Sequence, residues 1–385
     1  MLFSCKQNSK VKKTYKKDYT AINDTLTKNL QSVFKKGTIV RFSVSIVDDQ
    51  GFIYENGFGY TDIALTKKYT SNTTQNIASI SKTLIVVSLL KAKEQGKLNL
   101  NEPINKYLPF NVINPNYPEK PILIKHLAYH TSSIVDIDEV YSKSYVLKKA
   151  EHNENKGLYD WFNMPKTKIL LIDFIKNNLT VKGKWYTKEI FAITTPREIR
   201  EYSNIGAAIC AQIIEFATRQ DYQSFTKDYI IKPLKRASSG WSSKDINTTK
   251  RSRLFATKKM LIAEYSLITS ADGGFITSNK NLGLFLAEFM KDFKGEGKLL
   301  SKESYKKLFK KQQFSNIETE EKFGIFIEFS NEFIKIKNNV IGHNRSDPGV
   351  MKAMYFNQKT ETGKILFVNT DSDFDANFWP KVALI

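Results

Sequence analysis

The pattern of apolar and polar residues predicts strands near both ends of the chain and helices between them. Residues 20–35 carry Ile22, Leu26, Leu30, Val33 and Phe34 on one stripe, which predicts an amphipathic helix. Residues 42–47 and 52–54 alternate like strands around a polar turn, which predicts a hairpin. A strand pattern returns near the C-terminus, in residues 323–327, 333–336, 350–356 and 365–368.

These elements predict an α+β fold. One antiparallel β-sheet, assembled from both ends of the chain, is flanked by helices and carries an inserted all-helical region. We expect a single domain over residues 20–385, with its sheet part in about 20–75 and 270–385 and its helical part in about 76–269. Residues 1–19 are polar and rich in Lys, which is typical of a flexible tether.

Residues 76–96 combine an apolar helix with two side chains of chemical interest. The run from Leu84 to Leu90 is apolar on every side, which predicts a buried helix, and Gly96 is a suitable stop. Ser79 and Lys82 are three positions apart, so they share one face of the first turn. A Lys amine that is desolvated can be neutral and can activate a Ser hydroxyl. An ordinary N-cap Ser followed by a Lys has the same pattern, so the spacing alone leaves both interpretations open.

The chain is strongly basic, with a formal net charge of +20 from 59 Lys and Arg against 39 Asp and Glu. Such a charge favours anionic partners, and binding of an anionic polymer would then depend steeply on salt. The Lys residues are spread over the whole chain, however, and no nucleic-acid-binding motif accompanies them. We interpret the charge as a solvated surface and expect no nucleic-acid partner.

The chain has two cysteines, which excludes a disulfide framework. Cys210 lies in an apolar helical run and is expected to be a buried small side chain. Residues 2–5 resemble the end of a bacterial lipoprotein signal, in which Cys5 would be lipidated. This would place the protein in the cell envelope or periplasm, in contact with a membrane only through that N-terminal lipid. The sequence contains no run of 18 apolar residues, so it predicts no membrane-spanning helix.

Two histidines, His126 and His130, are four positions apart, as in some zinc sites. Leu127 stands where a zinc peptidase of that pattern has its Glu base, and few other histidines are present. We therefore expect no metal site and interpret both histidines as structural.

Several separated blocks together resemble the class C β-lactamase and penicillin-binding-protein-like serine hydrolases. They run in the order Ser79-Ile80-Ser81-Lys82, Lys125 to Ser132 with Ser133 in place of the usual Gly, Tyr202-Ser203-Asn204, Asp272-Gly273-Gly274, and Gly342 to Gly349. The resemblance covers the chain from about residue 38 onward and implies the β-lactamase/transpeptidase-like fold.

The resemblance also implies roles for individual residues, without a cofactor. Ser79 would be acylated and Lys82 would activate it, while Tyr202 would share proton transfer and Asn204 would orient Lys82. His343 would stand where related proteins carry the Lys of K-T-G, and the backbone N–H groups of Ser79 and Ser346 would form the oxyanion hole. Each residue also has a structural interpretation: Tyr202 as a packing residue, Asn204 as a helix N-cap, and His343 as an ordinary strand residue.

The last block departs from the family pattern, because it reads His-Asn-Arg where His-x-Gly is usual. Arg345 would face the same side of its strand as His343 and would bind a substrate carboxylate or narrow the cleft. The sequence thus predicts a serine hydrolase acting on an ester, a D-amino-acid peptide or a β-lactam-type amide. A catalytically impaired relative that binds a cell-wall peptide is the alternative.

Overall fold

The structure, a computed structural model, describes residues 19–36, 39–149, 161–235, 238–317, 322–328 and 340–370. Cys5 and the strand predicted at 333–336 lie outside these residues, so both stay predictions. Among the helices of the described ranges, none has the length and apolar character needed to cross a membrane.

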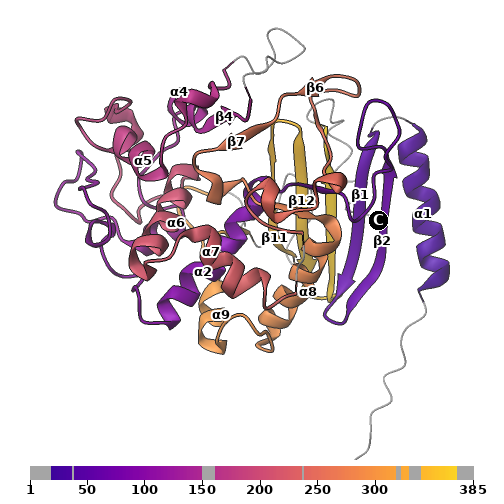
Figure 1. The fold of residues 1–385 in the computed structure, drawn as a ribbon. Coiled ribbons are helices and arrows are strands. Elements are labelled where there is room, and N and C mark those ends of the chain that lie inside the picture. Colours follow the sequence, from indigo (N-terminus) through magenta and orange to yellow (C-terminus); the bar gives the residue numbers. More distant parts are fainter. Residues whose placement is uncertain are drawn as a thin grey trace, which may run out of the picture.

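Both ends of the chain contribute to one seven-stranded antiparallel sheet (Figure 1), as the sequence predicts. From edge to edge its strands are β2 (Gly51–Gly59), β1 (Arg41–Asp48), β13 (Thr362–Val368), β12 (Val350–Asn357), β11 (Val340–Asp347), β10 (Ile327–Glu328) and β9 (Phe323–Gly324). The N-terminal hairpin joins the C-terminal strands where Phe42 of β1 lies opposite Val368 of β13.

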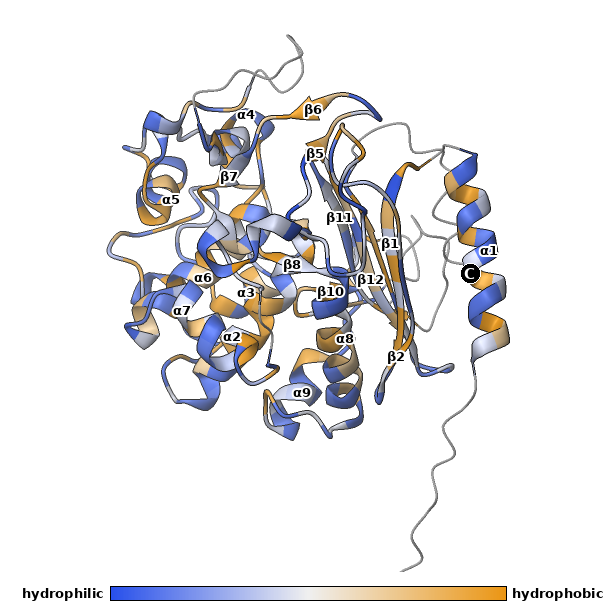
Figure 2. Ribbon diagram, turned by 45° about the vertical axis from the view of Figure 1, so that its right-hand side comes forward, coloured by the Kyte–Doolittle hydropathy of each residue, from blue (hydrophilic) through white to orange (hydrophobic). Residues whose placement is uncertain are grey.

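One face of the sheet packs against α1 (Thr20–Lys35), whose bounds are those expected from its apolar stripe. Leu26 and Leu30 of α1 are buried in a cluster with Phe42 of β1. Ile22 was expected on this stripe but is 64% exposed, while the next residue, Asn23, donates from its side chain to Ile53 O of β2 at 2.8 Å. Figure 2 shows α1 as a separate helix outside the sheet, with hydrophilic and hydrophobic residues interleaved.

The other face of the sheet is covered by α8 (Asn279–Lys294), which carries Leu282, Phe285 and Phe289 into the main core. The helical part of the molecule lies beyond it (Figure 1). Its helices are α2 (Lys82–Glu94), α3 (Ile124–Ala128), α4 (Asp138–Tyr141), α5 (Leu171–Leu179), α6 (Asn204–Thr218), α7 (Tyr222–Thr226) and α9 (Lys302–Leu308).

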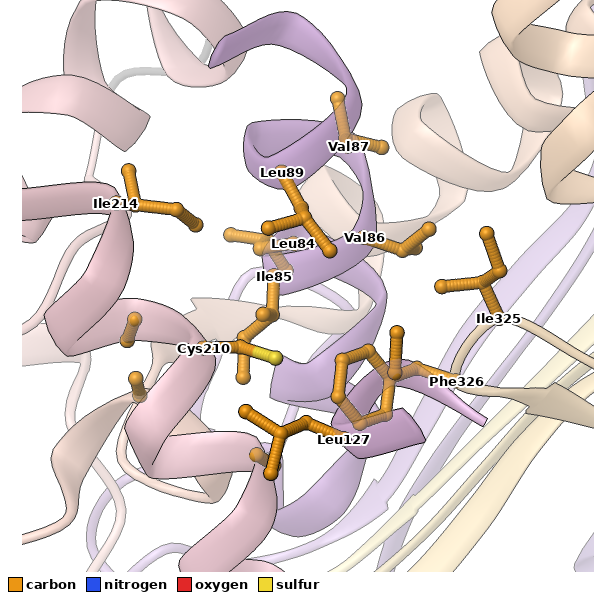
Figure 3. Packing of buried hydrophobic residues seen from close by; sticks show 14 of the residues in the cluster. Leu84, Ile85, Val86, Val87, Leu89, Leu127, Cys210, Ile214, Ile325 and Phe326 are labelled. Carbon is orange, nitrogen blue, oxygen red and sulfur yellow. The ribbon is translucent and has the colours of Figure 1, made fainter. Parts of the chain in front are cut away.

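Helix α2 is buried on every side, as its apolar run predicts. Figure 3 shows its side chains packed against Leu127, Phe326 and two residues of α6, Cys210 and Ile214. Full burial of an aliphatic side chain stabilises the folded state by roughly 1.5–3 kcal/mol. The several buried aliphatic side chains of α2 therefore fix the position of this helix in the core. The first residue of this fixed helix is Lys82.

The region predicted to be all-helical, about 76–269, also contains short strands, so that prediction is wrong in part. They form two pairs: β4 (Tyr145–Leu147) with β7 (Tyr265–Leu267), and β5 (Leu254–Phe255) with β6 (Leu261–Ile262). A third pair, β3 (Thr74–Asn76) with β8 (Ile276–Ser278), joins the two borders of that region. Strands of two or three residues are too short for a period of two to be visible in the sequence. They connect distant segments close to the site described next.

Candidate active site

The Ser79 hydroxyl and the Lys82 amine lie in direct contact. Ser79 lies on η1 (Ala78–Ser81), a 3-10 turn, and α2 begins at Lys82, whereas the sequence placed both on one helical turn. In a 3-10 helix residues three apart lie directly above one another, and Lys82 Nζ is 3.1 Å from Ser79 Oγ. Lys82 is fully buried, while Ser79 is half-buried and keeps part of its surface open to solvent.

Two further groups accept hydrogen bonds from the Lys82 amine. Nζ donates to Asn204 Oδ1 at 2.7 Å and to the backbone oxygen of Asp272 at 2.9 Å. A carbonyl oxygen can only accept, so these two bonds use both N–H groups of a neutral amine. The third neighbour is the Ser79 hydroxyl, to which Nζ also donates at 3.1 Å; an amine without its extra proton would turn its lone pair to that hydroxyl, because the other two neighbours can only accept. This arrangement suits a base that takes the Ser79 proton.

Tyr202 and His343 complete the group of residues predicted from the sequence. Lys82 Nζ lies 5.0 Å from the centroid of the half-buried Tyr202 ring, and the centroids of Tyr202 and His343 are 6.4 Å apart. His343 is only 2% exposed, and its Nδ1 lies 2.8 Å from the backbone oxygen of Asn344. The structure therefore brings together the five side chains Ser79, Lys82, Tyr202, Asn204 and His343, which come from three distant parts of the chain.

Helix α6 starts with a cap that leaves the Asn204 side chain available for Lys82. The N-cap is Ser203, whose hydroxyl accepts a hydrogen bond from Gly206 N at 2.9 Å. The interpretation of Asn204 as the N-cap is therefore wrong, because Asn204 is the first residue inside the helix. Its backbone is fixed by the helix and its amide oxygen is directed to Lys82.

Asp136, to which the sequence pattern gave no role, holds the beginning of α6. Its carboxylate accepts hydrogen bonds from Ser203 Oγ (2.9 Å), Asn204 N (2.6 Å) and Ile205 N (3.1 Å). A carboxylate at a helix N-terminus is favoured by the helix dipole. Burial nevertheless raises the pKa of Asp136, an effect that the α6 N–H groups and Lys82 oppose. The one sequence signal that could have indicated a role for Asp136 is its position just after the Thr131-Ser132-Ser133 block.

The two histidines considered as zinc ligands each accept a backbone hydrogen bond instead. Leu123 N donates to His126 Nδ1 and Ser203 N donates to His130 Nδ1, both at 3.1 Å. Burial lowers the pKa of His126 to about 4. The His130 ring also packs against the Tyr202 ring, tilted by 30° with centroids 4.5 Å apart, so it supports the Tyr202 segment. In the described ranges, no three His, Cys, Asp or Glu residues form a group that could hold a metal ion.

The β11 strand carries the remaining predicted residues. Ser346 is exposed and lies opposite Met351 of β12, and β11 packs against η1, the turn that carries Ser79. Arg345 lies opposite Lys352 of β12 in the strand register. It follows His343 by two residues on β11. The Arg345 side chain lies outside the described part of the structure, so its predicted contact with substrate stays a prediction.

The residue before Ser79 has an unusual backbone. Ala78 is fully buried and has φ +47°, in the left-handed region that costs an L-residue roughly 1–2 kcal/mol. Ile77 N donates to Phe275 O on one side of it, and Ile80 N donates to Ile77 O on the other. These bonds hold a sharp bend from which Ser79 emerges, as strained backbone often does at functional sites.

Solved structures share this fold. A class C beta-lactamase aligns with a TM-score of 0.69 at 15% identity, covering 96% of this chain and 97% of that chain. The octameric penicillin-binding protein homologue from Pyrococcus abyssi aligns with a TM-score of 0.68 at 19% identity, covering 96% of this chain and 77% of that chain. At these identities the likeness establishes the fold and leaves the activity open.

Sequence comparison agrees with the fold. Protein flp of Staphylococcus aureus (strain MW2) is 28% identical over 200 residues, which are 52% of this chain. This chain thus spans only 34% of that relative's length. A penicillin-binding protein of Bacillus subtilis (strain 168) is 23% identical over 209 residues, 54% of this chain and 40% of that protein. The family model Beta-lactamase matches residues 26–377, and the chain therefore belongs to the beta-lactamase family of serine hydrolases.

Proposed function

We propose that this protein hydrolyses its substrate through an acyl-enzyme on Ser79. The observation that carries the proposal is the hydrogen bonding of Lys82. Its amine is 3.1 Å from the Ser79 hydroxyl, and two carbonyl oxygens hold it from other sides. A base so oriented raises the nucleophilicity of a hydroxyl that is otherwise unreactive.

The reaction would proceed in two halves. Ser79 Oγ attacks the substrate carbonyl carbon while its proton passes to Lys82 Nζ, and the carbonyl oxygen becomes an oxyanion facing the N–H groups of Ser79 and Ser346. The oxyanion collapses, the bond to the leaving group breaks, and the leaving group takes the proton from Lys82 through the Tyr202 hydroxyl. A water molecule, losing a proton to the same base, then attacks the ester and releases Ser79.

Three substrate classes fit this chemistry: a carboxylic ester, a D-amino-acid peptide and a β-lactam-type amide. All three present a carbonyl carbon with a leaving group that needs one proton. The names of the similar proteins support the last two classes, because they include a class C beta-lactamase and penicillin-binding proteins. The pocket that receives the substrate decides among them.

Covalent labelling tests the proposal directly. The protein is incubated with a penicillin and, separately, with a fluorophosphonate, and its intact mass is followed with time. We expect a mass increase with each probe in the wild type and none in Ser79→Ala. Ser142→Ala, a change at a half-buried Ser of the helical part, should label like the wild type. An adduct that forms equally in Ser79→Ala would overturn the proposal.

The same experiment separates an enzyme from a binding protein. An enzyme loses the penicillin adduct with time and regains its original mass, since water completes the second half of the reaction. A penicillin adduct that stays on Ser79 for hours would instead support the alternative, a catalytically impaired protein that holds a cell-wall peptide. We further propose that the protein acts in the cell envelope, lipidated at Cys5, because residues 2–5 resemble the end of a bacterial lipoprotein signal.

A further inference from the structure

The outward side of helix α1 carries three exposed lysines, Lys28, Lys35 and Lys36, which we call the basic surface of α1. Lys28 and Lys35 are seven positions apart, which places both on the side of the helix opposite the buried Leu26. Among the residues that the structure describes, no acid forms an ion pair with any of the three. Their charge is therefore available to an anion from outside the chain.

Two hollows adjoin the basic surface of α1. One, of about 450 Å³, is lined by Lys28, Gln31, Ser32, Lys35 and Lys36. The other, of about 720 Å³, shares Gln31 and Lys35 and extends along the edge strand β2 to Lys68. The one acid among the described residues that line either hollow is Glu55, which is paired with Lys280 at 2.8 Å. Positive charge and N–H donors therefore line both hollows, which suits the oxygens of a phosphate group.

The sequence before α1 extends this positive charge. Residues 6–36 contain nine Lys against two Asp, whereas the whole chain has 59 Lys and Arg against 39 Asp and Glu. Lys residues occur throughout the chain, but acids are scarce in this stretch, so about a third of the net charge of +20 belongs to it. Basic clusters next to a membrane anchor bind the headgroups of anionic lipids. The stretch that follows the predicted lipid site at Cys5 has that composition.

The place of α1 in the fold suits contact with an extended surface. Helix α1 is the outermost layer on its side of the sheet (Figure 1), while α2 and the turn that carries Ser79 pack against the opposite face. A surface in contact with α1 therefore does not cover Ser79. Tyr19, just before α1, comes fourteen residues after Cys5, and fourteen residues span at most about 50 Å. A lipid on Cys5 thus keeps α1 close to the membrane.

We propose that the basic surface of α1 docks on an anionic membrane, with lipid phosphates bound at the two hollows. This contact is additional to the lipid proposed at Cys5, and it does not depend on the reaction proposed at Ser79. The apolar stripe of α1 is buried against the sheet, so it is not available for insertion between lipids. The attraction is therefore electrostatic, and it weakens as salt screens the charges.

Co-sedimentation with lipid vesicles tests the proposal. The full chain carries Cys5→Ser, so that no lipid on Cys5 contributes to binding. At low salt we expect binding to phosphatidylcholine vesicles that contain about 30% phosphatidylglycerol, and little binding to phosphatidylcholine alone. Each Lys near an anionic surface strengthens binding about fivefold, so the combined variant Lys28→Gln, Lys35→Gln, Lys36→Gln should bind about 100-fold more weakly. Raised salt should abolish the binding of both proteins.

A matched control separates the basic surface of α1 from the net charge of the chain. Lys166→Gln, Lys168→Gln and Lys182→Gln together remove the same charge from exposed positions of the helical part. This variant should bind anionic vesicles nearly as tightly as the wild type. An equal loss in both triple variants would overturn the proposal, and so would wild-type binding that does not need phosphatidylglycerol. Tighter binding to soluble polyphosphate than to anionic vesicles would also overturn it, since the partner would then be a polymer.

A second measurement keeps every lysine in place. In the Cys5→Ser protein, a fluorophore is attached at Ser32→Cys, on the outward side of α1, or at Thr167→Cys, in the helical part. Both positions are exposed, whereas Cys210 is buried and out of reach of the reagent. Anionic vesicles that carry a quenching lipid should quench the dye at residue 32 and leave the dye at residue 167 unchanged. Equal quenching at the two positions, or stronger quenching at residue 167, would overturn the proposal.

Discussion

The carboxylate of Asp136 offers a sharp test of how the site is assembled. Asp136→Ala removes the acceptor of three donors: the Ser203 hydroxyl and the backbone N–H groups of Asn204 and Ile205. These donors form the first turn of α6, and the side chain of Asn204 in that turn holds Lys82. The substitution should therefore weaken the fold and also displace the base.

The magnitude follows from the hydrogen bonds that are lost. A bond to a charged acceptor contributes about 1.5–3 kcal/mol, and the cost of burying the Asp136 carboxylate offsets part of the sum. We expect the free energy of unfolding to fall by about 3 kcal/mol. With an unfolding entropy of about 2.1 cal/mol/K per residue, this lowers the melting temperature by about 4 °C. Displacement of Asn204 should slow Ser79 labelling at least about tenfold.

Urea unfolding followed by circular dichroism measures the first effect, and the penicillin labelling rate measures the second. Asp138→Ala is the matched control, because Asp138 is exposed two residues further along the chain and should change stability by less than about 0.5 kcal/mol. A variant at Asp136 that unfolds and labels like the wild type would refute the reasoning. Lost stability with an unchanged labelling rate would refute the link from Asp136 through Asn204 to Lys82.

Three further outcomes are expected. Ala78→Gly should change the free energy of unfolding by less than about 1 kcal/mol, because relief of the backbone penalty at φ +47° is offset by the loss of a fully buried methyl group and by the greater freedom of glycine in the unfolded chain; a loss above about 2 kcal/mol in urea unfolding would contradict this. Burial raises the pKa of Asp292 to about 8, so the native state keeps a proton that the unfolded chain releases near pH 4, and stability is lost as pH rises between these values. Asp292→Asn should therefore lose about 4 kcal/mol less than the wild type between pH 5 and pH 9 in urea unfolding, and an equal loss in both proteins would show the acid to be ionised in the fold. Arg345→Gly should speed the reaction with bulky amides, and unchanged rates on both a small ester and a β-lactam would contradict the predicted role of Arg345 in substrate choice.

Periodicity predicted the long elements well, because each of them buries one definite face. The helix expected at residues 20–35 has those bounds in α1, and the hairpin formed by β1 and β2 lies where the alternation placed it. The start of α2 differs from the prediction, because Ser79 lies on a 3-10 turn that precedes the helix. Residues around Ser79 are buried on all sides, so apolar spacing carries no information on whether the turn is 3-10 or α.

The site was only partly predictable, and the missing residues share one property. Asp136 and the backbone oxygen of Asp272 act through contacts that are 67 to 190 positions apart in the chain. Ser79 and Lys82 are neighbours on one turn, so their spacing alone indicated contact, and Tyr202, Asn204 and His343 came from the family resemblance. A group that supports such residues from another segment has no local sequence pattern, because the tertiary fold alone determines which donors it meets.

The burial of Lys82 connects stability and chemistry at this site. A fully buried amine is costly unless its N–H groups are bonded, and here Asn204 Oδ1 and the Asp272 backbone oxygen accept them. Both acceptors lie on rigid elements, one at the first residue of α6 and the other in the turn before β8. Because those two neighbours can only accept, the Ser79 hydroxyl, which takes the third bond from Nζ at 3.1 Å, is the one that the lone pair of a neutral amine would meet. The bonds that make Lys82 tolerable in the core are therefore the same bonds that direct it toward the hydroxyl as a base.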